Sequence, residues 1–123
     1  MSTAAYDDRD GYIWMDGQFM PWRDTKVHVL THAMHYASCV FEGERAYNGV
    51  IFKSRLHTER LHNSARIMGF EIPYTVDELE AVKQETLAKS GLESAYVRMF
   101  AWRGSEMMGV SAQNNTIHVA CAI

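Results

Sequence analysis

The order of hydrophobic patterns predicts an α+β domain with a largely antiparallel sheet and two helices packed on one side of it. Two pairs of short strand-like segments are joined by Asp16-Gly17 and by Asn48-Gly49, dipeptides that favour the tight turn of a β-hairpin. Two helix patterns follow the hairpins, and two further strand patterns come last. Two hairpins, then two helices, then two strands is an order typical of α+β domains.

The strands and helices follow from periodicity and from cap residues. Strands are predicted over 12–20 around the first turn, 40–53 around the second, 94–102 and 116–123, with one helical turn at 31–36. The first long helix runs from 54 to about 68 and ends at Gly69; its core-facing stripe is Leu56, Leu61, Ala65 and Met68. The second starts at a capping box, with Thr75 as N-cap and Glu78 at N3, and ends near Gly91.

Composition limits the classes of function. The chain has 123 residues, 47% hydrophobic and 22% charged, which fits one globular domain. A net charge of −3 gives no basic surface for nucleic acid or for an anionic membrane, and no apolar run is long enough to span a bilayer. Two cysteines are too few for a disulfide framework, so the expected location is the cytoplasm. The apolar strand at 116–123 predicts a first domain cut from a longer protein.

The segment 40–47 has an unusual pattern for a strand. Alternation places Phe41, Gly43, Arg45 and Tyr47 on one face and Glu42, Glu44 and Ala46 on the other. Glycine in a strand often marks the close approach of a ligand, and arginine among aromatic rings suits a carboxylate. The alternative is a half-buried strand with both aromatic residues in the core and Arg45 extending to water.

The segment 94–102 repeats that pattern, since Tyr96, Arg98, Phe100 and Trp102 share one face. If both strands lie in one sheet, the arginines and the tyrosine hydroxyls converge, and this predicts a site for a carboxylate. From the residues alone, this site and the ordinary core strand remain equally favoured.

Other reactive residues have simpler interpretations. His28, His32 and His35 have a spacing that a continuous helix would turn into a metal site, but the extended Val-His-Val run favours structural histidines and no metal. Cys39 is predicted to be a small buried thiol rather than a nucleophile. Arg60, taken alone, fits a solvated helix face beside Glu59.

The same residues resemble the branched-chain amino acid aminotransferases, which are fold-type IV pyridoxal-phosphate enzymes. The resemblance extends through nearly the whole chain in the family's order, and its specific part is Phe-Glu-Gly-x-Arg-x-Tyr at 41–47 with Tyr-x-Arg at 96–98. The other matching stretches are Tyr12-Ile13-Trp14 with Gly17, Lys26-Val27-His28-Val29, His32-Ala33-Met34-His35-Tyr36, and Arg60-Leu61-His62 with Ser64-Ala65.

The resemblance implies that residues 1–123 are the N-terminal small domain, which forms the lid of the substrate pocket. It implies that Arg60 holds the phosphate of pyridoxal 5'-phosphate, that Val110 lies in a loop reaching the neighbouring subunit, and that the enzyme is a homodimer or a higher homo-oligomer. The residues that it assigns to the substrate pocket are Tyr36, Phe41, Gly43, Arg45, Tyr96, Arg98 and Val110.

The reaction implied belongs to branched-chain amino acid biosynthesis: the amino group of Leu, Ile or Val passes through the cofactor to 2-oxoglutarate. No catalytic residue is expected within the chain, because the Schiff-base lysine of this family lies in the large domain, beyond Ile123. Residues 1–123 alone are therefore expected to be inactive.

Several positions depart from the family pattern, namely Ala37, Glu44, Met99 and the segment 111–114. Two alternatives therefore stay open. One is a related fold-type IV enzyme: a D-amino acid or amine transaminase, or an aminodeoxychorismate lyase. The other is a carboxylate-binding module without catalysis.

Overall fold

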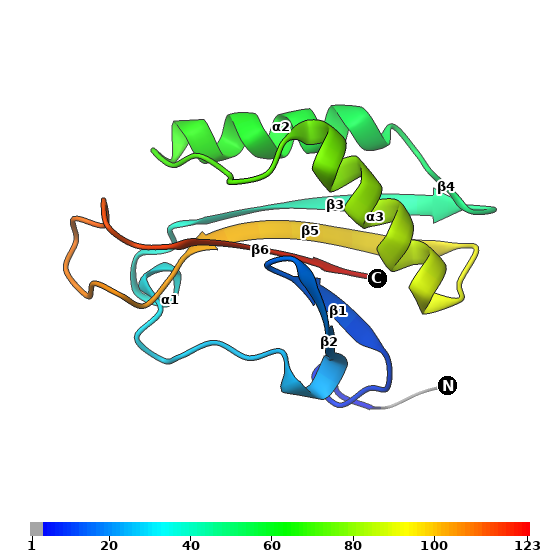
Figure 1. Cartoon of the computed structure of the whole chain (residues 1–123), viewed down its shortest axis with the longest axis horizontal. Coiled ribbons are helices and arrows are strands. Elements are labelled where there is room, and N and C mark those ends of the chain that lie inside the picture. Colours follow the sequence, from blue (N-terminus) through cyan, green and yellow to red (C-terminus); the bar gives the residue numbers. More distant parts are fainter. Residues whose placement is uncertain (1–3) are drawn as a thin grey trace.

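The computed structural model describes residues 4–123 as one twisted sheet with two long helices on one face (Figure 1). The sheet has six strands in the order β2-β1-β6-β5-β3-β4, and neighbouring strands are antiparallel. The α+β prediction is confirmed. Among the helices of residues 4–123, none is long and apolar enough to cross a membrane.

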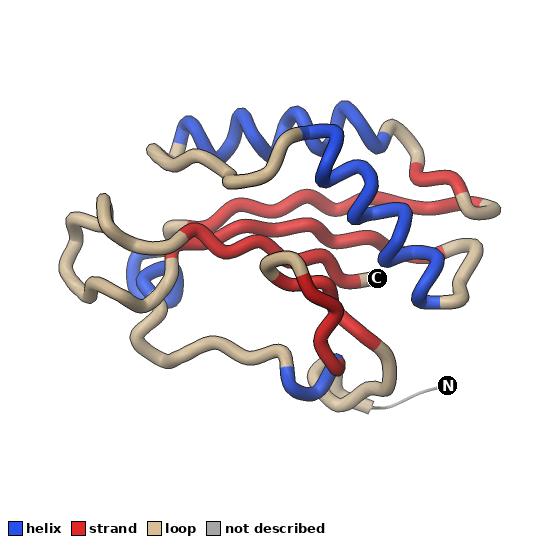
Figure 2. The backbone as a smooth tube through the Cα atoms, in the orientation of Figure 1, coloured by secondary structure: helices blue, strands red, loops and turns tan. Residues whose placement is uncertain are grey.

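The N-terminal part contains a hairpin, a connector and a short helix (Figure 2). Strands β1 (Tyr12–Met15) and β2 (Gln18–Pro21) join at Asp16 and Gly17, whose φ angles of 50° and 95° suit the predicted turn. A 3₁₀ turn η1 (Trp22–Asp24) leads into a connector, and α1 (His32–Tyr36) is the predicted single helical turn.

The second hairpin is shorter than predicted. Strand β3 spans Cys39–Tyr47, whereas β4 covers only Val50–Ile51. The expected extension to Lys53 is wrong, because Lys53 adopts a left-handed conformation with φ of 53° and turns the chain directly into α2. As a result, β4 pairs with β3 only at Ala46 and Tyr47.

Helices α2 (Ser54–Ile67) and α3 (Val76–Ser90) lie on the same face of the sheet (Figure 1). The capping box at Thr75 is confirmed, since its side chain accepts from the Glu78 N–H and the Glu78 side chain accepts from the Thr75 N–H. The predicted stripe of α2 is partly wrong: Leu61 and Ala65 are buried, but Leu56 and Met68 are exposed. Thr58 and His62 face the core instead, because each has a hydrogen-bond partner there.

Strands β5 (Ala95–Arg103) and β6 (Ile117–Ala122) complete the sheet. The main core lies between the helices and the sheet face that carries Val97, Met99 and Val119, all fully buried. The opposite face of β3 and β5 has no long helix against it within the described residues, and it carries Phe41, Gly43, Arg45, Tyr96 and Arg98.

Candidate functional site

The two unusual segments of the sequence are neighbours in the sheet. In the β3–β5 register Phe41 lies opposite Phe100, Gly43 opposite Arg98, and Arg45 opposite Tyr96. Residues opposite each other in an antiparallel pair point to the same face. The two groups of residues that alternation assigned to one face therefore share that face in the fold.

This face is open, so the alternative of a core strand is wrong. Phe41 and Tyr47 are 59% and 55% exposed, while the intervening side chains of β3 are buried against the helices. Cys39 lies on the same open face and is exposed, which corrects the prediction of a buried thiol. The helices pack on the face that holds Glu42 and Glu44, a choice that alternation alone does not determine.

Arg98 and Tyr96 are arranged over the strand β3. The Arg98 guanidinium lies 4.7 Å from the centroid of the Phe41 ring, and its Nη2 donates to the Tyr96 hydroxyl at 2.9 Å. A Cβ added to Gly43 would meet the Tyr96 hydroxyl oxygen at 2.6 Å, so Gly43 leaves the space that Tyr96 fills. A hollow beside this pair is lined by Tyr6, Trp22, Tyr96, Arg98, Ala122 and Ile123.

Arg45 does not converge with Arg98 on one point. Its guanidinium lies 5.6 Å from the centroid of the Tyr47 ring, towards the β4 end of the strand. Of the two arginines on this face, Arg98 is therefore the one placed between the Phe41 ring and Tyr96.

Arg60 lies on the other side of the sheet, on α2. Its Nε and Nη2 donate to the two oxygens of Glu42 at 2.8 and 2.7 Å, and His57 Nδ1 lies 2.7 Å from Glu42 Oε1. The predicted neighbour Glu59 instead pairs with Arg55 at 3.6 Å. Burial raises the pKa of Glu42, but the hydrogen bonds from Arg60 and His57 outweigh it, so this pKa is lowered overall.

The free edge of β3 lies between these two groups. Within the described residues no strand pairs with Cys39–Glu44 of β3 on the side away from β5, because β4 begins its pairing at Ala46. A ligand placed against this edge can reach side chains from both faces of the strand, since successive residues alternate between them. Arg60 therefore lies beside one face of β3 at this edge, and Phe41, Gly43 and Arg98 lie on the other face.

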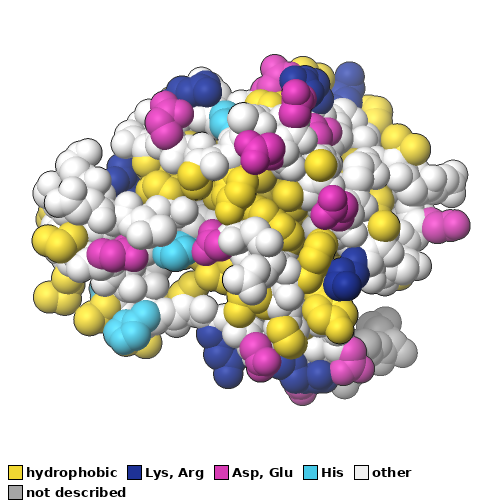
Figure 3. Space-filling view, viewed as in Figure 1, with side chains coloured by type: hydrophobic (Ala, Val, Ile, Leu, Met, Phe, Trp, Pro, Cys, Tyr) yellow, Lys and Arg dark blue, Asp and Glu magenta, His cyan; other side chains and the backbone are white. Residues whose placement is uncertain are grey.

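Tyr36 and Val110 belong to a second region, at the end of the sheet where α1 meets the loop 104–116 (Figure 1). The Tyr36 hydroxyl donates to the Met108 carbonyl at 3.3 Å, and His32 Nε2 lies 3.0 Å from the Gly109 carbonyl. Hydrophobic side chains gather on this end of the molecule (Figure 3), and the exposed ones include Val29, Leu30, Met34, Met107, Met108 and Val110.

The three histidines considered for a metal site have separate partners. His32 Nδ1 lies 2.7 Å from the Ser38 hydroxyl, His35 Nε2 lies 2.8 Å from the Val29 carbonyl, and His28 Nδ1 accepts from the Leu30 N–H. Within residues 4–123, no group of three His, Cys, Asp or Glu side chains is placed to hold a metal ion.

Sequence patterns do not identify two buried groups, Glu42 and Lys83, as candidate site residues. Glu42 was only part of a motif, and its contact with α2 joins residues 18 positions apart. Lys83 is fully buried and donates to Glu44 at 2.8 Å, and it also contacts Glu80 at 3.0 Å. The one available signal was the acidic residue at 44, where the resembling family commonly has an apolar one.

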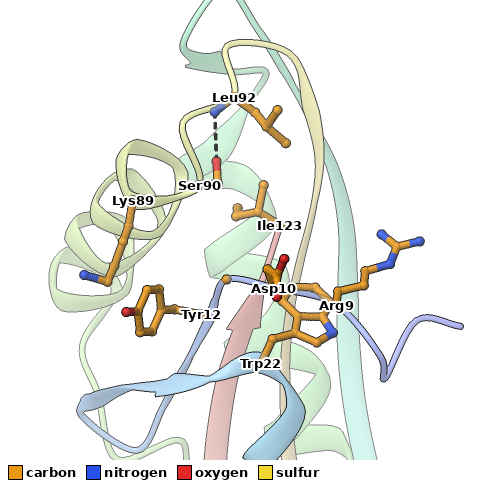
Figure 4. A pocket seen from close by; sticks show the side chains of 9 residues that line it. Arg9, Asp10, Tyr12, Trp22, Lys89, Ser90, Leu92 and Ile123 are labelled. Atoms are coloured by element: carbon orange, nitrogen blue, oxygen red, sulfur yellow. Dashed lines mark hydrogen bonds between the residues drawn. The ribbon is translucent and has the colours of Figure 1, made fainter. Parts of the chain in front are cut away.

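A separate pocket lies near the end of α3 (Figure 4). Tyr12 and Trp22 line it together with Lys89 and Ile123, and the Ser90 hydroxyl accepts from the Leu92 N–H at its rim. The residues predicted for cofactor and substrate are not among those that line it.

Comparisons with known proteins identify the family of the chain. The class IV amino-transferase family matches residues 39–122, more than half of the chain. The chain is 46% identical over 119 residues to a branched-chain-amino-acid aminotransferase of Pseudomonas aeruginosa, covering 94% of this chain and 39% of that protein. The chain belongs to the class IV aminotransferase family.

Solved structures show the same fold. The chain superposes on a branched-chain amino acid aminotransferase from Escherichia coli with a TM-score of 0.88 and 39% identity, covering 93% of this chain and 40% of that one. A branched-chain amino acid aminotransferase from T.th., complexed with N-(5'-phosphopyridoxyl)-L-glutamate, gives a TM-score of 0.84 at 39% identity, covering 92% of this chain and 41% of that one. The fold is that of fold-type IV aminotransferases, and the chain spans about two fifths of the relatives' length.

Proposed function

We propose that this chain is the small domain of a pyridoxal-phosphate-dependent aminotransferase that transfers the amino group of Leu, Ile or Val to 2-oxoglutarate. The observation that carries the proposal is the free edge of β3, with Arg60 beside one face and Phe41, Gly43 and Arg98 on the other. Family membership supports the class of reaction. The phosphopyridoxyl-glutamate complex of the T.th. relative supports both the cofactor and a glutamate-sized acceptor product.

Each side of the edge suits one part of the ligand. Arg60 is a fixed cation whose Nη1 has no hydrogen-bond partner among residues 4–123, which fits a phosphate. Arg98 over the Phe41 ring fits a carboxylate beside an apolar side chain. Tyr96 and Gly43 shape the same face and Arg45 borders it, whereas Tyr36 and Val110 lie in the second region, where α1 meets the loop 104–116. When bound, pyridoxal phosphate supplies the electron sink, and these residues supply orientation and charge.

The remaining chemistry is assigned to the rest of a longer protein. The chain spans 39% of the Pseudomonas aeruginosa relative, and we place the Schiff-base lysine in the part that it does not cover. Residues 1–123 alone are then inactive. The exposed apolar side chains around Met108 and Val110 support a homodimer in which this loop packs on the neighbouring subunit. Both cysteines are free thiols, which agrees with a cytoplasmic location.

The test uses the complete protein and compares Arg98→Ala with Arg60→Ala. Arg98→Ala should raise the KM for leucine about tenfold or more with cofactor retained, because a charge-assisted hydrogen bond to the carboxylate is lost. Arg60→Ala should release cofactor, measured by absorbance after gel filtration. Arg55→Ala on the same helix is the matched control and should change neither, since Arg55 pairs with Asp77 and Glu59.

A substrate panel decides between the proposal and its alternatives. Turnover of branched-chain L-amino acids with 2-oxoglutarate supports it. Turnover restricted to D-amino acids, amines or aminodeoxychorismate would replace the substrate assignment, and a protein that binds carboxylates without cofactor would overturn the enzymatic interpretation altogether. Equal cofactor retention in both arginine variants would undo the division of roles between the two faces of β3.

A further inference from the structure

We propose that Glu42 is the positioning residue for Arg60, holding one edge of its guanidinium so that the opposite edge is presented to the cofactor phosphate. This inference rests on the proposed function, because it takes the phosphate of pyridoxal phosphate as the ligand of Arg60. It adds a role for an acidic residue that does not itself contact the ligand.

The contact between the two side chains fixes the guanidinium. Glu42 accepts from Nε and from Nη2, a side-on pairing that sets both the position and the plane of the group. The donors that remain, both on Nη1 and one on Nη2, point away from the carboxylate. Within residues 4–123 no group accepts a hydrogen bond from Nη1, and the Arg60 side chain is 65% exposed.

The carboxylate is itself held firmly. Glu42 lies on β3 and its side chain is only 4% exposed, so its position is set by the sheet rather than by a flexible surface chain. His57 on α2 supplies the second contact, to Oε1. Because the pKa of Glu42 is lowered, the group is an ionised acceptor and His57 Nδ1 is the donor. An arginine anchored in this way loses little further freedom when it binds a phosphate.

Glu44 is a natural control for this role. It lies two residues along the same strand, faces the same helices and is also buried, but its carboxylate pairs with Lys83 instead of Arg60. If Glu42 served only to stabilise the fold, neutralising either carboxylate would have similar consequences for cofactor binding. If Glu42 positions Arg60, only its own neutralisation affects the binding of a phosphate.

The experiment titrates the apo form of the complete enzyme with pyridoxal phosphate and with pyridoxal, which lacks the phosphate, and follows the absorbance of the bound aldehyde. Glu42→Gln should raise the dissociation constant for pyridoxal phosphate about tenfold and leave that for pyridoxal unchanged. Glu44→Gln should change both by less than about twofold. Adding Glu42→Gln to Arg60→Ala should weaken binding no further, because the two residues act as one unit.

Two results overturn the inference. One is a Glu42→Gln enzyme that binds pyridoxal phosphate as tightly as the parent; the other is an equal loss for pyridoxal, which indicates a general structural role. If Glu42→Gln does not fold, Glu42→Asp serves in its place and should weaken only the phosphorylated cofactor. Failure of the proposed function looks different: the unaltered complete protein then binds no pyridoxal phosphate, or Arg60→Ala has no effect on it.

Discussion

The two faces of β3 reverse the usual division of a strand into an apolar buried side and a polar exposed side. Towards the helices the strand carries Glu42 and Glu44, which are 4% and 2% exposed, whereas the opposite face carries the exposed rings of Phe41 and Tyr47. The buried carboxylates are tolerated because the helices bring cations to them. One face of β3 is thus joined to the helices by ion pairs, whereas the other stays open for a ligand or for further protein.

The largest expected effect is on the buried ion pair. Lys83→Met should lower the free energy of unfolding by about 3–5 kcal/mol, because it leaves Glu44 buried without its partner. Urea unfolding followed by far-UV circular dichroism measures this loss.

The double variant Lys83→Met with Glu44→Leu sharpens the prediction. Removing both charges should recover most of the lost stability, since well-packed apolar side chains can replace a buried ion pair. A double variant as unstable as Lys83→Met alone would show that the unpaired charge of Glu44 does not cause the loss of stability.

A smaller effect separates the two carboxylates by their dependence on pH. Burial raises the pKa of Glu44 above its usual 4.5 despite Lys83, whereas the contacts with Arg60 and His57 outweigh burial and lower that of Glu42. The contribution of Glu42 is therefore present above pH 4.5 and is lost as the pH falls through its lowered pKa. Glu44 acts in the opposite sense: it reduces stability as the pH rises from 4.5 through its raised pKa.

Unfolding curves of Glu42→Gln and Glu44→Gln across this pH range test the difference in sign. Glu42→Gln should flatten the loss of stability on the acid side, and Glu44→Gln should flatten the decline above pH 4.5. The same change of slope in both variants would mean that the two sites are not electrostatically distinct.

The smallest effect is expected on the open face. Phe41→Ala should change stability by less than about 0.5 kcal/mol, because the ring is 59% exposed. Met99→Ala on the buried face is the comparison and should cost about 2–5 kcal/mol, since Met99 is fully buried. Thermal unfolding distinguishes the two, and a large loss for Phe41→Ala would contradict the assignment of an open face.

Local signals made much of the fold predictable. The Asp16-Gly17 turn, the capping box at Thr75 and the shared face of Phe41 with Phe100 all depend on residues near one another in the chain or on simple alternation. Which face of the sheet the helices cover depends on tertiary contacts between residues that are distant in the chain. The general preference of aromatic residues for the core would place Phe41 inside, which is wrong here. The carboxylates on the other face are buried instead, because cations on the helices pair with them.

The candidate site was predictable mainly through resemblance. Spacing alone suggested a carboxylate site at Arg98, and the structure brings Phe41, Gly43 and Tyr96 around it. Spacing did not connect Arg60 with Glu42, because that contact depends on how α2 crosses β3. Nor did it place the unpaired edge of β3, which results from the shortness of β4.

The division of roles between the two faces of β3 is tested most directly by a crystal structure of the complete protein with pyridoxal phosphate and a branched-chain carboxylate bound. We predict that the ligand lies along the free edge of β3, with its phosphate on Nη1 of Arg60 and its carboxylate beside Arg98 and Phe41, while Glu42 stays paired to Nε and Nη2. A phosphate held by other residues, with Arg60 directed to solvent, would contradict it.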